Sequence, residues 1–240
     1  MISYRRLIAI MRPLWLRGGL RRVSHLWWEW DTSGNCQRPL TREHFARPKK
    51  RETDKVFPWE PGKPGPIGLR MIVRCKKCDR CTAARAASWR LRAMSEFGNA
   101  DRVWFVTLTF RPEVQHRVLE ACRRRTLPDD FDALGPDERF RLLANESGRE
   151  VTKYLKRLRA SGAVFRYLAV AEAHKSGRPH WHVLVYERGD AVRWRTLSEA
   201  WGLGFVTAKL ADKKAAHYLC KYLTKSLARV RASLRFGKNV

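Results

Sequence analysis

The sequence predicts an α+β protein built on a central, mainly antiparallel sheet, and three observations indicate this fold class. The chain has 240 residues, of which 44% are hydrophobic, so it can bury a real core. Several short segments after residue 100 alternate apolar and polar positions and are rich in β-branched and aromatic residues, as strands are. The segments between them space their apolar residues three and four apart, as amphipathic helices do.

The first part of the chain shows no such regularity. Residues 1–68 hold scattered tryptophans, a basic run at 47–51 and many prolines, which predicts a basic, weakly ordered, irregular arm. The prolines and glycines at 58–68 indicate a linker at its end. Residues 69–98 form the next segment, with a cysteine cluster followed by an Ala- and Arg-rich helix over 82–97.

The main domain is predicted over residues 99–230, and residues 231–240 are expected to be a tail. Its first element is a strand over Val103–Phe110, where apolar, β-branched and aromatic residues alternate. Residues 111–147 are polar and interrupted by prolines, which predicts a long, partly helical excursion. Apolar residues three, four and seven apart then predict a helix over Glu150–Ala160.

The rest of the domain alternates strands with helices that begin at acidic caps. In chain order these elements are strand Phe165–Glu172, a turn at Ser176-Gly177, strand His180–Tyr186, a helix from Asp190 to about Trp201, strand Phe205–Lys209 and a helix from Asp212 to about Ala228. The resulting order from residue 103, β-α-β-β-α-β-α, resembles a ferredoxin-like arrangement. In that arrangement helices cover one face of the sheet and the other face is left open for a ligand.

The charge of the chain excludes some classes of function. There are 50 Lys and Arg against 23 Asp and Glu, which gives a net charge of +27. An enzyme for neutral metabolites has no need of this excess, whereas a protein that binds a polyanion such as DNA or RNA does. No stretch reaches the roughly 18 consecutive apolar residues of a membrane span, and the N-terminus lacks a clear signal-peptide pattern. A cytoplasmic protein without a membrane partner is therefore expected.

The sharpest local pattern is His180-Trp181-His182, within a predicted strand. Residues two apart in a strand point to the same face, so the two imidazoles form a pair of possible metal ligands while the tryptophan points the other way. Glu172 is a possible third ligand, because the short turn would fold its carboxylate back beside them; His174, in the turn, is a rival for this role. Two histidines and one carboxylate leave open positions on a divalent ion that must also hold a phosphate oxygen. The alternative is a pair of half-buried structural histidines beside a solvated strand end.

The second pattern lies on the last predicted helix. Tyr218 and Tyr222 are four residues apart and share one face, and Lys221 and Lys225 form a second such pair beside them. A phenol is a poor nucleophile at neutral pH, and a neighbouring ammonium would favour the phenolate and steady negative charge on a phosphate. The alternative is an amphipathic helix with two core tyrosines and solvated lysines.

A third pattern is the run Cys75-x-x-Cys78-x-x-Cys81, whose spacing suits thiolate ligation in a reducing compartment. Structural Zn²⁺ takes four ligands, so a fourth is required. The candidates for it are Cys36, Cys122, Cys220 and a histidine. An iron–sulfur cluster and free thiols are the alternatives.

A zinc site here would order the helix that follows, and its arginines would then contact the DNA backbone. These arginines are Arg85, Arg90 and Arg92. The alternative for them is a solvated basic face.

Three segments in this order resemble the motifs of HUH endonucleases, the initiators of rolling-circle replication. They are FVTLTF at 105–110, GRPHWH at 177–182 and YLCKYLTK at 218–225. The paired tyrosines are similar to those of the initiators of microvirus-type and filamentous-type single-stranded DNA phages. In that group a CxxCxxC segment precedes the first motif, as CKKCDRC does here, and a KRLR-type helix precedes the strand with the glutamate. In the first motif Thr107 and Thr109 share one face, which fits ordinary strand packing or the floor of a site.

The resemblance implies a DNA-nicking and joining enzyme. A divalent ion, Mg²⁺ or Mn²⁺, would be held by His180, His182 and Glu172 and would polarise the scissile phosphate. Tyr218 or Tyr222 would attack and leave a 5′-phosphotyrosyl link at a single-stranded DNA origin, and the freed 3′-OH would prime the host replication machinery. After one round the second tyrosine would cleave the regenerated origin; if a single tyrosine acts, Tyr218 is favoured.

The resemblance also implies a location in the cytoplasm of a bacterial host and DNA contacts from further basic residues. These residues are Lys156, Arg157, Arg159 and Arg178. Two other functions remain open from the sequence. One is a non-enzymatic, basic, zinc-containing nucleic-acid-binding protein, and the other is a transposase or relaxase with the same chemistry.

Overall fold

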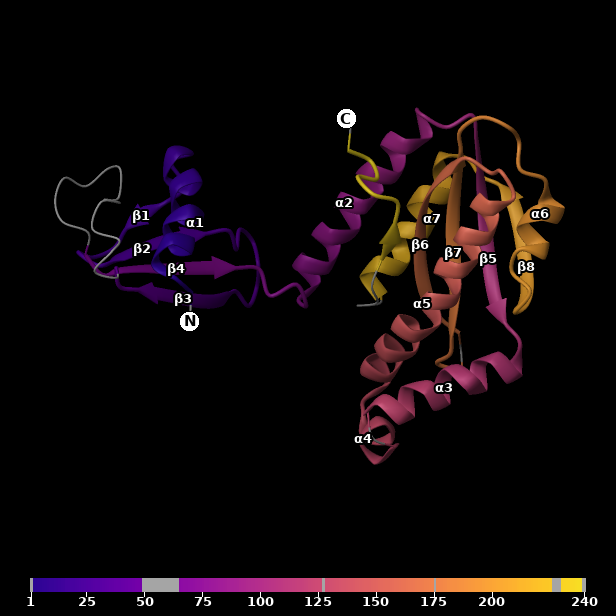
Figure 1. Cartoon of the computed structure of the whole chain (residues 1–240), viewed down its shortest axis with the longest axis horizontal. Helices are drawn as coiled ribbons and strands as arrows, with labels where there is room; N and C mark the ends of the chain where they lie inside the picture. The colour runs from indigo at the N-terminus through magenta and orange to yellow at the C-terminus, as the bar shows by residue number, and fades with distance from the viewer. Residues whose placement is uncertain (1, 49–64, 127, 175, 226–229, 239–240) are drawn as a thin grey trace. The chain divides into compact units, whose positions relative to one another are not determined.

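The computed structural model describes residues 2–48, 65–126, 128–174, 176–225 and 230–238. The chain divides into two compact units, Met1–Cys81 and Thr82–Val240. Figure 1 shows their elements, labelled in chain order. No helix in the described ranges is long and apolar enough to cross a membrane.

The N-terminal unit is one helix on a four-stranded sheet (Figure 1). Its elements are α1 (Tyr4–Leu16), β1 (Arg21–Arg22), β2 (Trp27–Asp31), β3 (Leu40–Ala46) and β4 (Ile67–Val73). The strand order is β1-β2-β4-β3, in which β2 and β4 run parallel and the other pairs run antiparallel. Leu7 and Met11 of α1 are fully buried against a sheet face that includes Trp28 and Leu69.

The prediction of a weakly ordered, irregular arm over 1–68 is therefore wrong for most of that range. The apolar residues Tyr4, Leu7 and Met11 recur at helical spacing, and Trp28 and Trp30 of β2 alternate as a strand requires, so both elements bury an apolar face. Most of the predicted linker at 58–68 lies outside the described residues, but its last part begins the inner strand β4.

The C-terminal unit is built on a five-stranded sheet in the order β8-β5-β7-β6-β9, with every described pair antiparallel. Its elements are α2 (Asp79–Phe97, which begins before the boundary between the units), β5 (Arg102–Phe110), α3 (Pro112–Thr126), α4 (Pro128–Ala133), α5 (Pro136–Ala160), β6 (Phe165–Ala173), β7 (Pro179–Glu187), α6 (Trp194–Glu199), β8 (Gly204–Leu210), α7 (Lys213–Lys225) and β9 (Arg231–Ala232). The predicted α+β class, the antiparallel sheet and the order of strands and helices are confirmed.

Helices cover both faces of this sheet, so the prediction of one open face is wrong. On one face Val151 and Leu155 of α5 pack with Trp181 of β7, together with α3 and α6. On the other face α2 and α7 pack on the sheet, where Leu184 of β7 meets Leu219 of α7. Both faces of the inner strands carry apolar residues, and a second helical layer removes that extra surface from water.

The excursion at 111–147 is almost wholly helical and not partly so. Its three prolines, read as breakers, stand at the first positions of α3, α4 and α5. Proline is favoured there because the first amide of a helix has no partner within the helix to lose. As a result α5 begins at Pro136 and not at Glu150.

Two smaller predictions are also corrected. Asp190 does not cap a helix: α6 begins at Trp194, because the amide of Val192 is held in the loop by a hydrogen bond to the buried carboxylate of Glu187. The tail at 231–240 joins the fold, since β9 pairs with β6 and Phe236 is buried in the core between the sheet and α2.

Candidate metal centre and tyrosine helix

The hairpin of β6 and β7 brings three possible metal ligands to one point. In its register Glu172 lies directly opposite His180, and His182 lies two residues further along the same face. Trp181 points to the other face, where it is almost fully buried in the α5 core. The side chains therefore lie on the faces that the sequence predicts.

The carboxylate of Glu172 bridges the two imidazoles. Its Oε2 lies 2.9 Å from Nε2 of His180 and 2.7 Å from Nε2 of His182. Partial burial works to raise the pKa of Glu172, but the hydrogen bonds from both histidines outweigh it, so the pKa is lowered. Burial lowers the pKa of His182 more than Glu172 raises it, which favours the neutral imidazole that binds metals.

The ligand atoms of Glu172, His180 and His182 all lie within 4.8 Å of one another, a group that could hold a metal ion. His174, the rival ligand, is not part of this group; its Nδ1 lies 3.4 Å from the Ser176 hydroxyl. Two imidazole nitrogens and one carboxylate oxygen are a donor set that divalent first-row metals and Mg²⁺ accept, so the residues present fit a bound ion.

Thr107 contributes to the site in a way that the sequence only partly indicates. Its Oγ1 lies 3.0 Å from Nδ1 of His182, so both ring nitrogens of this histidine have partners. A hydrogen bond to the second nitrogen of a ligating histidine fixes the orientation of its ring. Strand packing alone would not place the hydroxyl here, so Thr107 is part of the floor of the site.

Helix α7 places both tyrosines over this centre. Asp212 caps the helix, with its carboxylate 2.9 Å from the amide of Lys214. The ring of Tyr222 stacks on His182, with a centroid distance of 5.0 Å and an angle of 18° between the ring planes. The ring of Tyr218 packs edge-on against Tyr222 at 5.2 Å.

The two tyrosines differ in their access to solvent. Tyr218 is 52% exposed, whereas Tyr222 is only 5% exposed. Burial raises the pKa of Tyr222, and Tyr218 and the charge of Glu172 raise it further. Lys221 is exposed on the same helix, and the side chain of Lys225 lies outside the described residues. The structure therefore places one accessible phenol and one shielded phenol beside the metal ligands.

A cavity of about 360 Å³ opens beside His180. Thr107 and Thr109 line its floor, and Gln115 of α3 and Arg178 line its wall. The amide oxygen of Gln115 accepts a hydrogen bond of 2.8 Å from Arg178, which holds this guanidinium at the cavity. Sequence patterns did not single out Gln115, because its role depends on how α3 packs beside β5.

The other basic residues predicted to contact DNA lie in two places. Arg85, Arg90 and Arg92 are on α2, which packs on the same sheet face as α7. On α5, at the opposite face, Arg157 donates to the backbone oxygens of Ala200 and Trp201, and Arg159 stacks over aromatic rings at the start of β6. Lys156 lies beside them and is exposed. Thus Arg178 is the predicted DNA contact that borders the metal centre, and Arg157 also ties helices together within the fold.

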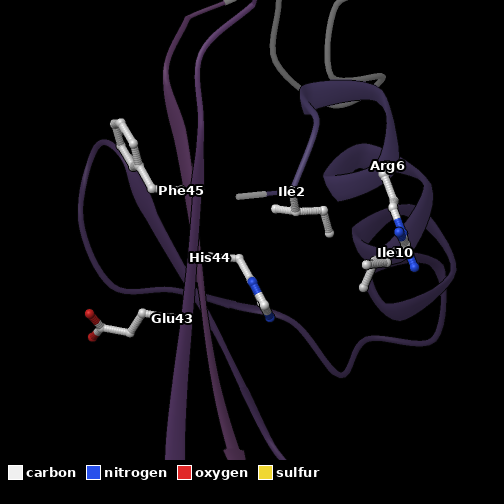
Figure 2. A pocket seen from close by; sticks show the side chains of 6 residues that line it. All are labelled: Ile2, Arg6, Ile10, Glu43, His44 and Phe45. Carbon is white, nitrogen blue, oxygen red and sulfur yellow. The ribbon is translucent and has the colours of Figure 1, made fainter.

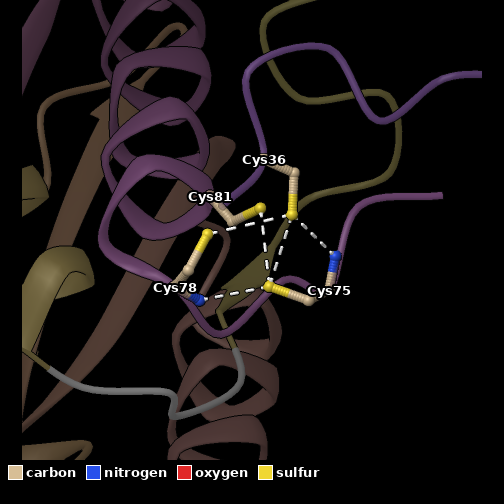
Figure 3. A group of neighbouring side chains, drawn as sticks. All are labelled: Cys36, Cys75, Cys78 and Cys81. Atoms are coloured by element: carbon tan, nitrogen blue, oxygen red, sulfur yellow. Dashed lines mark hydrogen bonds between the residues drawn. The ribbon is translucent and has the colours of Figure 1, made fainter. Parts of the chain in front are cut away.

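A second group of possible metal ligands lies in the N-terminal unit. Cys36 joins the three predicted cysteines, Cys75, Cys78 and Cys81, and the four sulfurs lie within 4.8 Å of one another (Figure 3). The remaining candidates, Cys122 and Cys220, are buried in separate cores of the other unit, where burial raises the pKa of each thiol to about 11.

The same unit has a hollow of about 550 Å³ beside α1 and β3. Figure 2 shows His44 pointing toward Ile2 and Ile10 of the helix side, while Glu43 and Phe45 point to the other side of the strand. His44 is the single potential metal ligand that faces α1 among these lining residues, so this hollow does not gather a catalytic set.

Comparison with known proteins agrees with the C-terminal unit. A family model for the replication-associated protein ORF2 matches residues 103–227, from β5 through α7, and this segment contains the three metal ligands and both tyrosines. No curated protein and no solved structure matches the chain. Because the family match covers more than half of the 240 residues, the chain belongs to this family of replication-associated proteins.

Proposed function

We propose that this protein initiates and terminates rolling-circle replication by nicking and rejoining a specific single-stranded DNA origin. Membership of the replication-associated family supports a role in replication initiation. The observation that carries the chemical proposal is the position of α7: it places two tyrosines within ring contact of a histidine that belongs to a metal-ligand group.

The proposed ion is Mg²⁺ or Mn²⁺, bound by Glu172, His180 and His182. When bound, it would act as a Lewis acid that polarises the scissile phosphate. The chain's own contribution is to hold the ligands in place before the DNA arrives. Thr107 and the stacked ring of Tyr222 restrict His182 from both sides, which favours a rigid site.

Tyr218 is the proposed first nucleophile because it is accessible and lies next to the centre. Its phenolic oxygen would form a bond to phosphorus, and the 3′ oxygen of the preceding nucleotide would leave and be protonated. The product is a 5′-phosphotyrosyl link and a free 3′-OH that the host replication machinery can extend. The ammonium of Lys221, one turn along α7, would favour the phenolate and balance the charge that grows on the phosphate.

Tyr222 is proposed to act in the second cleavage, after one round of synthesis. Its phenol is shielded and its pKa is raised, so it is the poorer nucleophile in the arrangement described here. Attack by Tyr222 requires the helix or the DNA to move, because the ring now covers His182. The two tyrosines would thus act in sequence, with Tyr218 first.

Arg178 and the cavity beside His180 are proposed to receive the DNA next to the scissile phosphate. The guanidinium, oriented by Gln115, is suited to a phosphate oxygen. The arginines of α2, on the face shared with α7, would extend the contact along the strand.

A covalent-adduct assay tests this function. The full-length protein is incubated with a pool of single-stranded DNA circles, with Mn²⁺ or with a chelator, and analysed on a denaturing gel. We expect a slowly migrating adduct that requires the metal and disappears in the variant with both Tyr218→Phe and Tyr222→Phe. Sequencing the trapped ends identifies the origin.

Tyr154→Phe is the matched control, because the buried hydroxyl of Tyr154 has no hydrogen-bond partner among the described residues and does not face the site. His180→Ala and His182→Ala should abolish the adduct while leaving DNA binding intact. An adduct that forms at the wild-type rate with chelator, or in the double tyrosine variant, would contradict the mechanism. Salt-sensitive binding without any adduct on the identified origin would favour the non-enzymatic alternative.

A further inference from the structure

We propose that Cys36, Cys75, Cys78 and Cys81 bind one structural Zn²⁺ ion that fastens the loop after β2 to the first turn of α2. This inference goes beyond the proposed nicking reaction, since all four residues belong to the N-terminal unit, outside the segment matched by the replication family.

The distances between the sulfur atoms are those of a site for a single ion. Four thiolates at about 2.3 Å from one tetrahedral Zn²⁺ lie about 3.8 Å from one another. The sulfur of Cys36 lies 3.5 Å from that of Cys75 and 3.9 Å from that of Cys78, and the sulfurs of Cys75 and Cys81 are 3.9 Å apart. A disulfide would bring one pair to about 2.05 Å, and an iron–sulfur cluster would hold the sulfurs further apart around several irons.

The topology of the sheet explains why a cysteine so distant in sequence joins the other three. Strands β2 and β4 are parallel neighbours, so their carboxyl ends lie at the same edge of the sheet. Cys36 follows β2 after a short turn, and Cys75 follows β4 directly, so both reach that edge. The amide of Thr32 continues the pairing beyond the strand with a hydrogen bond of 2.8 Å to Ile72. Spacing along the sequence alone could not distinguish Cys36 from the other candidates.

Backbone amides are already directed at the sulfurs, as is common for bound thiolates. The amide of Cys75 lies 3.4 Å from the sulfur of Cys36, and the amides of Lys77 and Cys78 lie 3.5 Å and 3.3 Å from the sulfur of Cys75 (Figure 3). Lys76 has φ of 63°, a left-handed conformation that is uncommon for a lysine and that tightens this turn. Amide donors of this kind orient ligands and stabilise their negative charge.

The basic surroundings favour four thiolates further. Arg74, Lys76 and Lys77 are within the same turn, and Arg74 also donates to the side chain of Asn35 at 3.0 Å, next to Cys36. A tetrathiolate zinc site has a net charge of −2, which these cations compensate. The set of ligands is soft and lacks oxygen donors, so it is suited to Zn²⁺ and not to Mg²⁺.

The test is the metal content and the cobalt spectrum of the full-length protein. We expect one zinc per chain after purification. Replacement of zinc by Co²⁺ should give the intense visible absorption of tetrahedral thiolate coordination. Cys36→Ser should lose at least about tenfold in metal affinity, whereas Cys122→Ala, the matched control from another core, should keep one zinc.

Cys36→His keeps the proposal testable if the serine variant does not fold. It retains a zinc ligand, so we expect one zinc per chain and a cobalt spectrum shifted by the exchange of one sulfur for nitrogen. Three results would overturn the proposal: a wild-type protein without stoichiometric metal, iron in place of zinc, or a Cys36→His cobalt spectrum identical to wild type. None of these results depends on whether the protein nicks DNA.

Discussion

The ring of His182 is held on three sides. Glu172 bonds one ring nitrogen, Thr107 bonds the other, and Tyr222 stacks on its face. A ligand that cannot rotate loses little entropy when an ion binds and does not fall back to a non-binding rotamer. Removing one of these restraints should therefore weaken metal binding even though the three ligands remain.

Thr107→Val tests this restraint, because valine keeps the shape of threonine and removes its hydroxyl. We expect Mn²⁺ affinity to fall about tenfold or more, as is typical when a partner of a ligating histidine is lost. Thr109→Val is the matched control, since Thr109 lies on the same strand and face without bonding to a ligand. Titration calorimetry measures both. Equal affinities in the two variants would show that the hydroxyl of Thr107 does not orient the site.

The order of the two tyrosines is tested by single substitutions on the origin sequence. Tyr218→Phe should remove the first adduct, because the accessible phenol is lost. Tyr222→Phe should keep the first cleavage within about threefold of wild type, because phenylalanine preserves the ring that packs on His182, but it should impair release of circles. Single-turnover cleavage and circle release measure the two steps. First cleavage that survives Tyr218→Phe and fails in Tyr222→Phe would reverse the assignment.

The residues of the site differ in how far the sequence predicts them. His180 and His182 are predictable because side chains two apart in a strand share a face, whatever surrounds the strand. Gln115 and Cys36 were beyond prediction as members of specific sites, because each meets its partners through packing between distant segments. Local geometry is readable from sequence, whereas contacts across the fold depend on topology.

At the scale of secondary structure elements, Glu187 joins β5, β7 and the start of α6. Its buried carboxylate accepts hydrogen bonds from Arg102 at 2.7 Å, from the indole of Trp104 at 2.7 Å and from the amide of Val192 at 3.0 Å. A buried charge with this many partners is stabilised in place, and its partners depend on it in turn.

Glu187→Ala should lower the free energy of unfolding by about 3 kcal/mol, because it leaves an indole and a buried amide without an acceptor. Glu199→Ala is the control: its ion pair with Arg195 is exposed and should contribute less than about 1 kcal/mol. Urea unfolding of both variants measures the difference. A loss as small as that of the control would show that water replaces the carboxylate.

The elements themselves were largely predictable where their periodicity is strong. The strands Val103–Phe110 and Phe165–Glu172 agree with the structure to within a residue or two at each end. The errors arose where one residue type has two meanings: Pro112 and Pro136 begin helices, although a proline inside a polar stretch also suits a loop. The irregular composition of the first 68 residues likewise concealed a helix and strands whose apolar faces are short.

At the scale of the whole molecule, the positive charge is shared by both units. Residues 1–81 hold 19 Lys and Arg against 7 Asp and Glu, and residues 82–240 hold 31 against 16. We expect the affinity for single-stranded DNA to fall steeply with salt, with a slope in log–log form of about −0.7 per phosphate contacted. Fluorescence anisotropy measures this slope. Tyr218→Phe with Tyr222→Phe should leave it unchanged, and a flat salt dependence would contradict binding through phosphates.

Zinc removal should affect the two units differently. Because the binding energy of a structural metal is folding energy, a chelator should destabilise Met1–Cys81 and leave the unfolding of Thr82–Val240 little changed. Calorimetry of the full chain should show one transition that moves to lower temperature and one that does not. Two transitions that both ignore the chelator would show that the N-terminal unit does not depend on the metal.

The register of β6 and β7 has a consequence for quality control during folding. Glu172 meets His180 across the hairpin in one pairing alone, and a slip of one residue would turn both histidines toward the face that Trp181 now occupies. A mispaired hairpin could not assemble the ligand set, so metal capture would reward the correct pairing and no other. The centre would then act as a checkpoint: a molecule that has taken up its ion has, by that fact, passed an inspection of its own sheet.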